Sequence, residues 1–330
     1  MSRIHVSRSD QDVQAQPIDP AKVLTYSREI ESAPKRLICR ALEAVTGQRQ
    51  LARRAKDYHL DYQRDQDFWK LAFERLESKI VFGGEGLEGI PQEGPLVMVA
   101  NHPFGVIDGL AFGYTLSRRR KNFKILTNSA LCQVPEISDH LLPISFEQSK
   151  EAVALNLETR RIAMETLIEG GAIGVFPGGT VSTSAHWYGR AIDPEWKTFT
   201  AKMITKSNAC VIPLYFEGQN SRVFQILSHI SQTLRLAFMI NELKRGIGRD
   251  VQIQVGKPIA PERLQELRRD PQKLMEFLRL RTYALSGLPL SWKEYGWPHK
   301  PAKAKLSRAI PKMILRRKLE KRAQVRRQQR

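Results

Sequence analysis

A short apolar run that ends in a histidine constrains the fold of this chain most. The run Leu96–Ala100 is followed by Asn-His-Pro-Phe-Gly-Val-Ile-Asp-Gly, residues 101–109. Such a short apolar run, bounded by Gly and Pro, predicts a buried strand rather than a helix. The strand carries His102 to its C-terminal end, where open α/β sheets usually place their chemistry. The apolar residues 110–116 then predict a helix, and Asp108 lies in its first turn, where a carboxylate is favourable.

His102 and Asp108 are close enough in sequence for one tight turn to bring them face to face. A carboxylate on one ring nitrogen of a histidine fixes the tautomer, so that the other nitrogen can take a proton from an alcohol. No serine nucleophile lies in the local sequence, so the hydroxyl group would come from the substrate. On spacing alone, a purely structural role explains the two residues as well as a catalytic pair does: His102 would end a strand and Asp108 would cap a helix.

Two further blocks follow this first one in a fixed order. Phe-Pro-Gly-Gly-Thr-Val-Ser occupies residues 176–182, and the apolar, proline-containing Val-Ile-Pro-Leu-Tyr-Phe occupies residues 211–216. Together the three blocks resemble the glycerolipid acyltransferase family, of the lysophospholipid or 1-acyl-glycerol-3-phosphate type, and within it a bacterial hemolysin-like branch. The resemblance covers residues 82–260.

The resemblance implies an activity. A fatty acyl group would move from an acyl thioester, either acyl-CoA or acyl carrier protein, to the hydroxyl of a lysolipid in phospholipid or ornithine-lipid-type biosynthesis. His102 would be the general base and Asp108 would orient it. The resemblance implies no bound cofactor, no metal and no covalent enzyme intermediate.

The chain departs from the family pattern where the acceptor phosphate is held. Gly178 and Val181 stand where the family usually has Glu and Arg, and the stretch 141–146 lacks the arginine of the family's second block. We therefore expect an acceptor head group that differs from lysophosphatidate, with an ornithine-type lysolipid as one option. The candidates to replace the lost arginine are Arg160, Arg161 and Arg190.

The substrate-binding candidates come from these blocks and from polar strand ends. The glycine pair at 178–179 exposes N–H groups that can hold a phosphate or an oxyanion, although a plain tight turn competes with that interpretation. The polar residues 220–221 either line an acceptor pocket or cap the next helix. The full set is Asn101, Phe104, Gly105, Asn128, Phe176, Pro177, Gly178, Gly179, Thr180, Ser182, Asn220 and Ser221.

The fold class that follows is α/β, with a mixed, largely parallel central sheet flanked by helices. We expect a polar segment with amphipathic helices in residues 1–81, the acyltransferase domain in 82–290 and a basic tail in 291–330. The sequence Gly-Glu-Gly-Leu-Glu-Gly at 84–89 satisfies a dinucleotide pattern, but no helix start follows it, so we predict a turn there.

Helices are expected at several places along the chain. A helix over 65–79 carries an aromatic group that either packs in the core or dips into a membrane interface. Asp193, followed by proline, is expected to cap a helix that buries Trp196. The other predicted helical stripes are Ile38, Leu42 and Val45; Val153, Leu157, Met164 and Ile168; and Val223, Leu227, Ile230 and Leu234.

Charge points to a negatively charged surface as partner. The chain has a formal net charge of +19, and residues 298–330 hold thirteen Lys and Arg against a single acid, Glu320. A basic interfacial helix from Pro311 would bind an anionic membrane surface, and a solvated tail is the alternative. Nucleic acid is the least favoured partner, because no stacking aromatic motif accompanies the charge. The rival to an enzyme is a non-catalytic basic membrane- or RNA-binding protein that retains the fold.

The compartment follows from what the sequence lacks. No apolar stretch approaches the roughly 18 residues that span a bilayer, and the first thirty residues have no secretory signal. The three cysteines, Cys39, Cys132 and Cys210, are scattered and form neither a disulfide framework nor a zinc motif. We therefore expect a peripheral protein at the cytoplasmic face of the membrane.

Overall fold

Seven strands form one mixed sheet in the order β1-β9-β8-β2-β5-β3-β4. The computed structural model describes residues 25–27, 30, 32–128, 134–145 and 149–298, so the basic tail with the helix predicted from Pro311 lies outside the described residues. The run from β4 through β8 is parallel; β9 is antiparallel to β8 and parallel to β1. The predicted α/β class with a mixed, largely parallel sheet is confirmed. The strands are β1 (Ile80–Gly84), β2 (Leu96–Ala100), β3 (Phe123–Asn128), β4 (Leu141–Ile144), β5 (Ala172–Val175), β8 (Cys210–Phe216) and β9 (Val251–Val255), with β6 (Thr183–Ser184) and β7 (Ala191–Ile192) forming a separate antiparallel pair.

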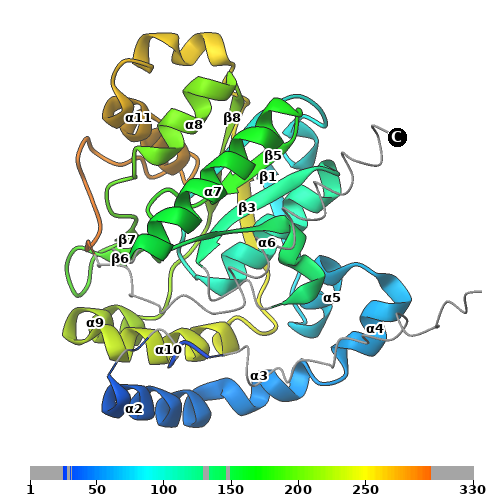
Figure 1. Ribbon diagram of the computed structural model, residues 1–330. Coiled ribbons are helices and arrows are strands. Elements are labelled where there is room, and N and C mark those ends of the chain that lie inside the picture. Colours follow the sequence, from blue (N-terminus) through cyan, green and yellow to red (C-terminus); the bar gives the residue numbers. More distant parts are fainter. Residues whose placement is uncertain (1–24, 28–29, 31, 129–133, 146–148, 299–330) are drawn as a thin grey trace, which may run out of the picture.

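Helices cover both faces of the sheet (Figure 1). Residues of α5, α6 and α10 pack on one face, and residues of α7, α8 and α11 pack on the other. None of the helices in the described part of the chain is both long and apolar enough to cross a membrane. The helices are α2 (Ala33–Glu43), α3 (Arg49–Arg54), α4 (Tyr58–Asp65), α5 (Phe68–Arg75), α6 (Val106–Arg119), α7 (Lys150–Ile168), α8 (Phe199–Ser207), α9 (Arg222–Ile230), α10 (Gln232–Arg245) and α11 (Pro271–Ala284).

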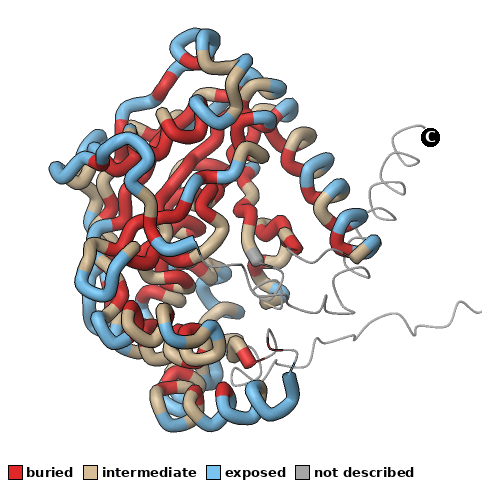
Figure 2. The backbone as a smooth tube through the Cα atoms, turned by 90° about the vertical axis from the view of Figure 1, so that its left-hand side faces the viewer, coloured by how far each residue is buried: buried red, intermediate tan, exposed pale blue. Residues whose placement is uncertain are grey.

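Strand β2 lies at the centre of the sheet and is buried along its whole length. Figure 2 shows that the buried segments gather in the interior of the molecule. Its side chains alternate between the two cores: Leu96 and Met98 pack with α6, while Val97 and Val99 pack on the opposite face. A strand covered on both faces needs apolar residues at every position, which explains the uninterrupted run in the sequence. The bounds of β2 match the predicted ones.

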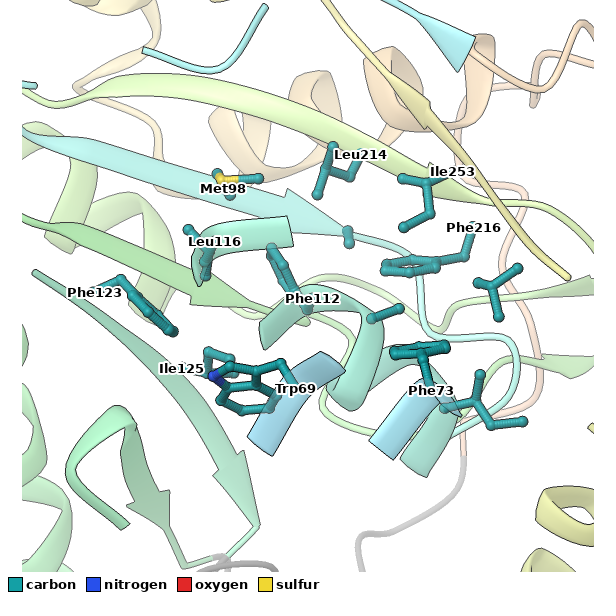
Figure 3. Packing of buried hydrophobic residues seen from close by; sticks show 14 of the residues in the cluster. Trp69, Phe73, Met98, Phe112, Leu116, Phe123, Ile125, Leu214, Phe216 and Ile253 are labelled. Carbon is teal, nitrogen blue, oxygen red and sulfur yellow. The ribbon is translucent and has the colours of Figure 1, made fainter. Parts of the chain in front are cut away.

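The predicted helix over 65–79 is broken, and its aromatic residues lie in the core. Gln66 adopts a left-handed conformation (φ 55°) at the end of α4, and α5 resumes at Phe68 and ends at Arg75. Trp69 and Phe73 are buried against α6 and the sheet, as Figure 3 shows. A Cβ atom at Gly113 of α6 would lie 2.1 Å from Cζ3 of Trp69, so a glycine is needed where the two helices touch. Core packing is therefore the correct interpretation of this aromatic group.

None of the three predicted helical stripes is the buried face of one helix. Ile38 and Val45 are exposed, and α2 buries Cys39 and Glu43 instead. On α7 the buried face is formed by Ala152, Leu155 and Ala163, whereas Val153 and Leu157 are exposed. The helix predicted through 223–234 is two helices, because Ser231 is extended between α9 and α10. The error on α7 arises because a stripe chosen by apolar residues alone ignores small and hydroxyl residues, which also pack closely against a neighbouring element.

Candidate active site

The histidine after β2 and the aspartate at the start of α6 are in contact. Nδ1 of His102 lies 3.0 Å from Oδ2 of Asp108, at hydrogen-bonding distance. The Asp108 side chain is fully buried, whereas 18% of the His102 side chain is exposed. Nε2 of His102 has no hydrogen-bond partner among the described residues. One ring nitrogen is thus held by a carboxylate, and the other remains available to a substrate.

The turn that brings the pair together depends on backbone bonds to the same carboxylate. Oδ2 of Asp108 also accepts from the N–H groups of Phe104 (2.8 Å) and Gly105 (2.9 Å), which caps α6. Gly105 has φ +90°, and a Cβ there would lie 2.3 Å from Cε of Met239. Only glycine tolerates both the dihedral angle and the contact. The Asp108 carboxylate therefore holds the turn and the imidazole at once.

The loop after β5 lies beside the histidine, because parallel strands β2 and β5 are neighbours. Phe176 stacks on the imidazole of His102 with ring centroids 4.1 Å apart. The N–H of Ser182 donates to the carbonyl oxygen of His102 (2.8 Å). The N–H of Gly179 donates to the carbonyl of Phe176 (3.0 Å), so this N–H closes a turn. The structure thus brings the sequence blocks 101–109 and 176–182 together at one edge of the sheet.

A second carboxylate reaches the same turn. Oδ1 of Asp193 accepts from the backbone N–H of His102 (3.2 Å) and from Oγ of Ser182 (2.5 Å), and Oδ2 accepts from Nε1 of Trp196 (2.8 Å). Burial raises the pKa of Asp193, while its hydrogen bonds oppose that shift. The prediction that Asp193 caps a helix is wrong: α8 begins only at Phe199. Instead of capping a helix, the side chain contacts His102 and Ser182 of other segments and its own neighbour Trp196.

An arginine that the sequence did not single out binds the loop after β5. Arg235 of α10 is buried and donates to Oγ1 of Thr183 (2.6 Å), the carbonyl of Val181 (2.7 Å) and Oγ1 of Thr180 (3.3 Å). Burial lowers its pKa to about 9. No carboxylate of the described residues forms an ion pair with this guanidinium. Among the apolar residues of α10, the isolated charge was the only signal of its role.

The three arginines named as substitutes in the family pattern make other contacts. Arg160 lies over the ring of Phe199, Arg161 pairs with Glu158 and Glu165, and Arg190 donates to Oγ of Ser286 and the hydroxyl of Tyr215. None of these contacts reaches residues 177–182, whereas Arg235 binds this loop at Thr180 and Val181.

Other predicted site residues are held by the scaffold. The amide of Asn101 bonds to both the N–H and the carbonyl of Phe216 on β8, at 2.7 and 2.9 Å. Ser221 caps α9 by accepting from the N–H of Phe224, and it donates to Glu242. The neighbouring Asn220 is buried. The carbonyl of Pro177 accepts from the N–H of Lys197, the ring of Phe104 lies over Gly218, and Asn128 ends β3, with its side chain outside the described part of the structure.

The arrangement suits proton transfer from a hydroxyl. A half-buried imidazole, oriented by a buried carboxylate and backed by an aromatic ring, has the geometry of a general base. Among the described residues, no group of three or more His, Cys, Asp or Glu side chains could hold a metal ion.

Comparisons with known proteins find several similar chains. A family model described as "Acyltransferase" matches residues 47–288. A lyso-glycine lipid O-acyltransferase of Phocaeicola vulgatus is 30% identical over 227 residues, which cover 66% of this chain and 77% of that protein. A protein of the same description from Bacteroides thetaiotaomicron is 29% identical over 229 residues, covering 66% and 79%. The crystal structure of the 1-acyl-sn-glycerophosphate acyltransferase PlsC from Thermotoga maritima covers 83% of this chain and 90% of that chain, at 18% identity and a TM-score of 0.41.

Proposed function

The chain belongs to the acyltransferase family, and from this premise we propose that it moves a fatty acyl group from an acyl thioester to a lysolipid hydroxyl, with His102 as the general base. One observation carries the proposal. The imidazole of His102 is held at Nδ1 by the buried carboxylate of Asp108, 3.0 Å away, and remains partly exposed. A histidine that served only the fold would have no need of one free, accessible nitrogen.

In the proposed reaction, His102 and the two substrates account for every bond and for the proton that is transferred. Nε2 of His102 takes the proton of the acceptor hydroxyl while its oxygen attacks the thioester carbonyl. Collapse of the tetrahedral intermediate breaks the carbon–sulfur bond, and the departing thiolate receives the proton from the imidazolium. Asp108 stabilises that imidazolium through Nδ1–H. General-base assistance of this kind contributes roughly 10²–10⁴ in rate.

For the acceptor, we propose a lysolipid whose head group is an amino acid rather than a glycerol phosphate. Two relatives are named as lyso-glycine lipid O-acyltransferases. Position 178 is glycine and position 181 is valine, so the loop after β5 offers no charged side chain of its own there. An ornithine-type lysolipid has the same class of head group and belongs in the same test. The donor would be either acyl-CoA or acyl carrier protein, since both present the same thioester.

The test is a direct assay with purified protein. Radiolabelled palmitoyl-CoA or palmitoyl carrier protein is mixed with a lyso-glycine lipid, a lyso-ornithine lipid or lysophosphatidate, and products are identified by mass spectrometry. We expect acylation of the amino-acid lysolipids, loss of at least 10²-fold in His102→Ala, and full activity in His186→Ala, which removes an exposed histidine. Equal activity of His102→Ala and the unchanged protein would refute the general base. A protein with no activity on any acceptor would favour the non-catalytic alternative.

We further propose that α2 and the helical segment that follows it (Ala44–Gln48) contact an anionic membrane surface. The side chains of Leu37, Ile38 and Val45 are 52–86% exposed, and Lys35 and Arg49 are exposed nearby in the sequence. Exposed apolar residues beside cations suit an interfacial helix, and each cation near an anionic leaflet contributes about 1 kcal/mol. The basic segment after residue 298 would add to this attraction.

Vesicle sedimentation separates these contributions. Binding to phosphatidylglycerol vesicles should weaken when Leu37, Ile38 and Val45 are changed to Ser, and again when the chain is truncated after Trp297. The matched control changes Val153, Leu157 and Ile168 of α7 to Ser, because these are equally exposed and apolar. An equal loss of binding in this control would show that general hydrophobicity, rather than α2, is responsible.

A further inference from the structure

Asp193 joins its own segment to the turn at His102 and to Ser182 in the loop after β5. It follows β7, and its side chain is completely buried. One carboxylate oxygen binds the backbone of His102 and the hydroxyl of Ser182, and the other binds the indole of Trp196. The N–H of Ser182 in turn donates to the carbonyl of His102. Both backbone polar groups of His102 are thus used, one by Asp193 and one by a residue that Asp193 holds.

Gly178 leaves space for this carboxylate because it has no side chain. A Cβ built on Gly178 would lie 3.3 Å from Cβ, Cγ and Oδ2 of Asp193, which is tighter than ordinary contact. The side chain of Asp193 therefore packs directly on the backbone of the loop after β5. From the far side, the hydroxyl of Tyr283 on α11 accepts from the backbone N–H of Asp193 (2.7 Å). Asp193 is thus held through its carboxylate, through its backbone N–H and through its contact with Gly178.

A buried carboxylate of this kind has an energetic disadvantage. Among the described residues it forms no ion pair with Lys or Arg, and taking an ionised carboxylate out of water is unfavourable. Its three hydrogen bonds from N–H and O–H donors offset this only in part, since burial still raises its pKa. The ionised carboxylate is therefore better explained by the groups that it holds than by a gain in stability.

We propose that Asp193 is a positioning residue for acyl transfer, which fixes the His102 turn and the loop of residues 177–182 in one frame. The inference rests on the proposed function, because its effect on the reaction passes through His102. A misplacement of the base by a few tenths of an ångström would weaken proton transfer, which depends on near-ideal approach. The substrates themselves would still bind.

The key variant is Asp193→Asn. The amide oxygen can still accept from His102 and Ser182, but its NH₂ group would then face the N–H of Trp196, so two donors meet. We expect the side chain to shift and kcat to fall about 10- to 100-fold, with KM for both substrates changed less than 2-fold. Trp196→Phe in the same chain removes the competing donor, and we expect it to restore kcat at least 3-fold.

A second variant approaches the same contact from the loop. Gly178→Ala pushes a Cβ against Asp193 and should lower kcat without raising KM, in a protein that keeps the original carboxylate. The matched control is Gly189→Ala in the turn between β6 and β7, where a Cβ would lie 3.5 Å from its nearest neighbour. Gly189→Ala should leave kcat unchanged. The Gly178 variant keeps the proposal testable if Asp193→Asn does not fold.

The outcomes separate this inference from the proposed function. If His102→Ala loses activity and folded Asp193→Asn keeps full kcat, the positioning role is wrong and the general base stands. If Asp193→Asn lowers only thermal stability, with kcat per folded molecule unchanged, Asp193 has a structural role alone. If His102→Ala retains activity, the proposed function itself fails, whatever Asp193 does.

Discussion

The substitution Asp108→Asn isolates the charge of the carboxylate from its geometry. Oδ2 of Asp108 has three donors around it, from His102, Phe104 and Gly105, while Oδ1 is buried without a partner among the described residues. The amide oxygen of asparagine must therefore take the Oδ2 position, because NH₂ there would face two backbone N–H groups. The turn and the histidine tautomer are then kept, and only the negative charge is lost.

The expected magnitude follows from the strength of one hydrogen bond. A bond to a charged group contributes about 1.5–3 kcal/mol and a neutral one about 0.5–1.5, so the imidazolium loses about 1–2 kcal/mol of stabilisation. At about 1.4 kcal/mol per factor of ten, kcat should fall about 5- to 30-fold. Asp108→Ala also leaves the N–H groups of Phe104 and Gly105 without an acceptor. That change should lower the free energy of unfolding by about 2–6 kcal/mol.

The assay is kcat at saturating acyl-CoA and lysolipid, with urea unfolding measured on the same preparations. His102→Ala sets the lower limit of the activity. A loss in Asp108→Asn as large as that in His102→Ala would refute the reasoning, since it would mean that the asparagine does not keep the tautomer. A loss below 2-fold would show that the charge plays no part.

Three further outcomes follow from contacts of the scaffold. Asn101→Ala leaves the N–H and carbonyl of Phe216 unpaired and should lower the free energy of unfolding in urea by about 2–6 kcal/mol; a loss under 1 kcal/mol would contradict this. Gly113→Ala forces a Cβ into Trp69 and should cost about 1–3 kcal/mol, which Trp69→Leu should partly recover; purely additive losses would argue against the contact. Because burial raises the pKa of Asp193 above its ordinary 3.8, its ionised form destabilises the fold, and acidification from neutral pH through that raised pKa relieves the penalty. The Tm of Asp193→Asn relative to the unchanged protein should therefore fall as the pH is lowered from 7 to 4. A difference in Tm that does not change with pH would contradict this prediction. The titratable groups that face Asp193 are His102 and Tyr283, with Tyr215 and Arg190 beyond the tyrosine.

Local patterns were enough to predict the strands that carry the site. The apolar run Leu96–Ala100 placed β2 at its observed bounds. Spacing put His102 and Asp108 on one turn, because a strand end, a proline and glycines leave the chain few alternatives. The three family blocks lie close together because the parallel strands β2, β5 and β8 are neighbours, and their C-terminal ends lie at the same edge of the sheet.

Contacts between distant segments could not be predicted in this way. Asp193 followed by proline has the local pattern of a helix cap, yet its carboxylate binds residues of two other segments, His102 and Ser182. Arg235 is an isolated charge in a helix, and nothing in the sequence says which loop it meets. Asn101 was expected at the substrate, but its amide pairs with the backbone of Phe216 as a strand would. A side chain that hydrogen-bonds to a segment far away in the sequence produces no periodic pattern, so periodicity cannot reveal it.

The pairing of β1 with β9 has a consequence for how the chain is made. Ile80 pairs with Val251, so β1 leaves the ribosome long before its partner is synthesised. Until β9 arrives, one edge of β8 is also open, and exposed strand edges invite pairing with other chains. A nascent chain that stops short of residue 251 should therefore be prone to aggregation, because the edges of β1 and β8 that β9 covers remain open.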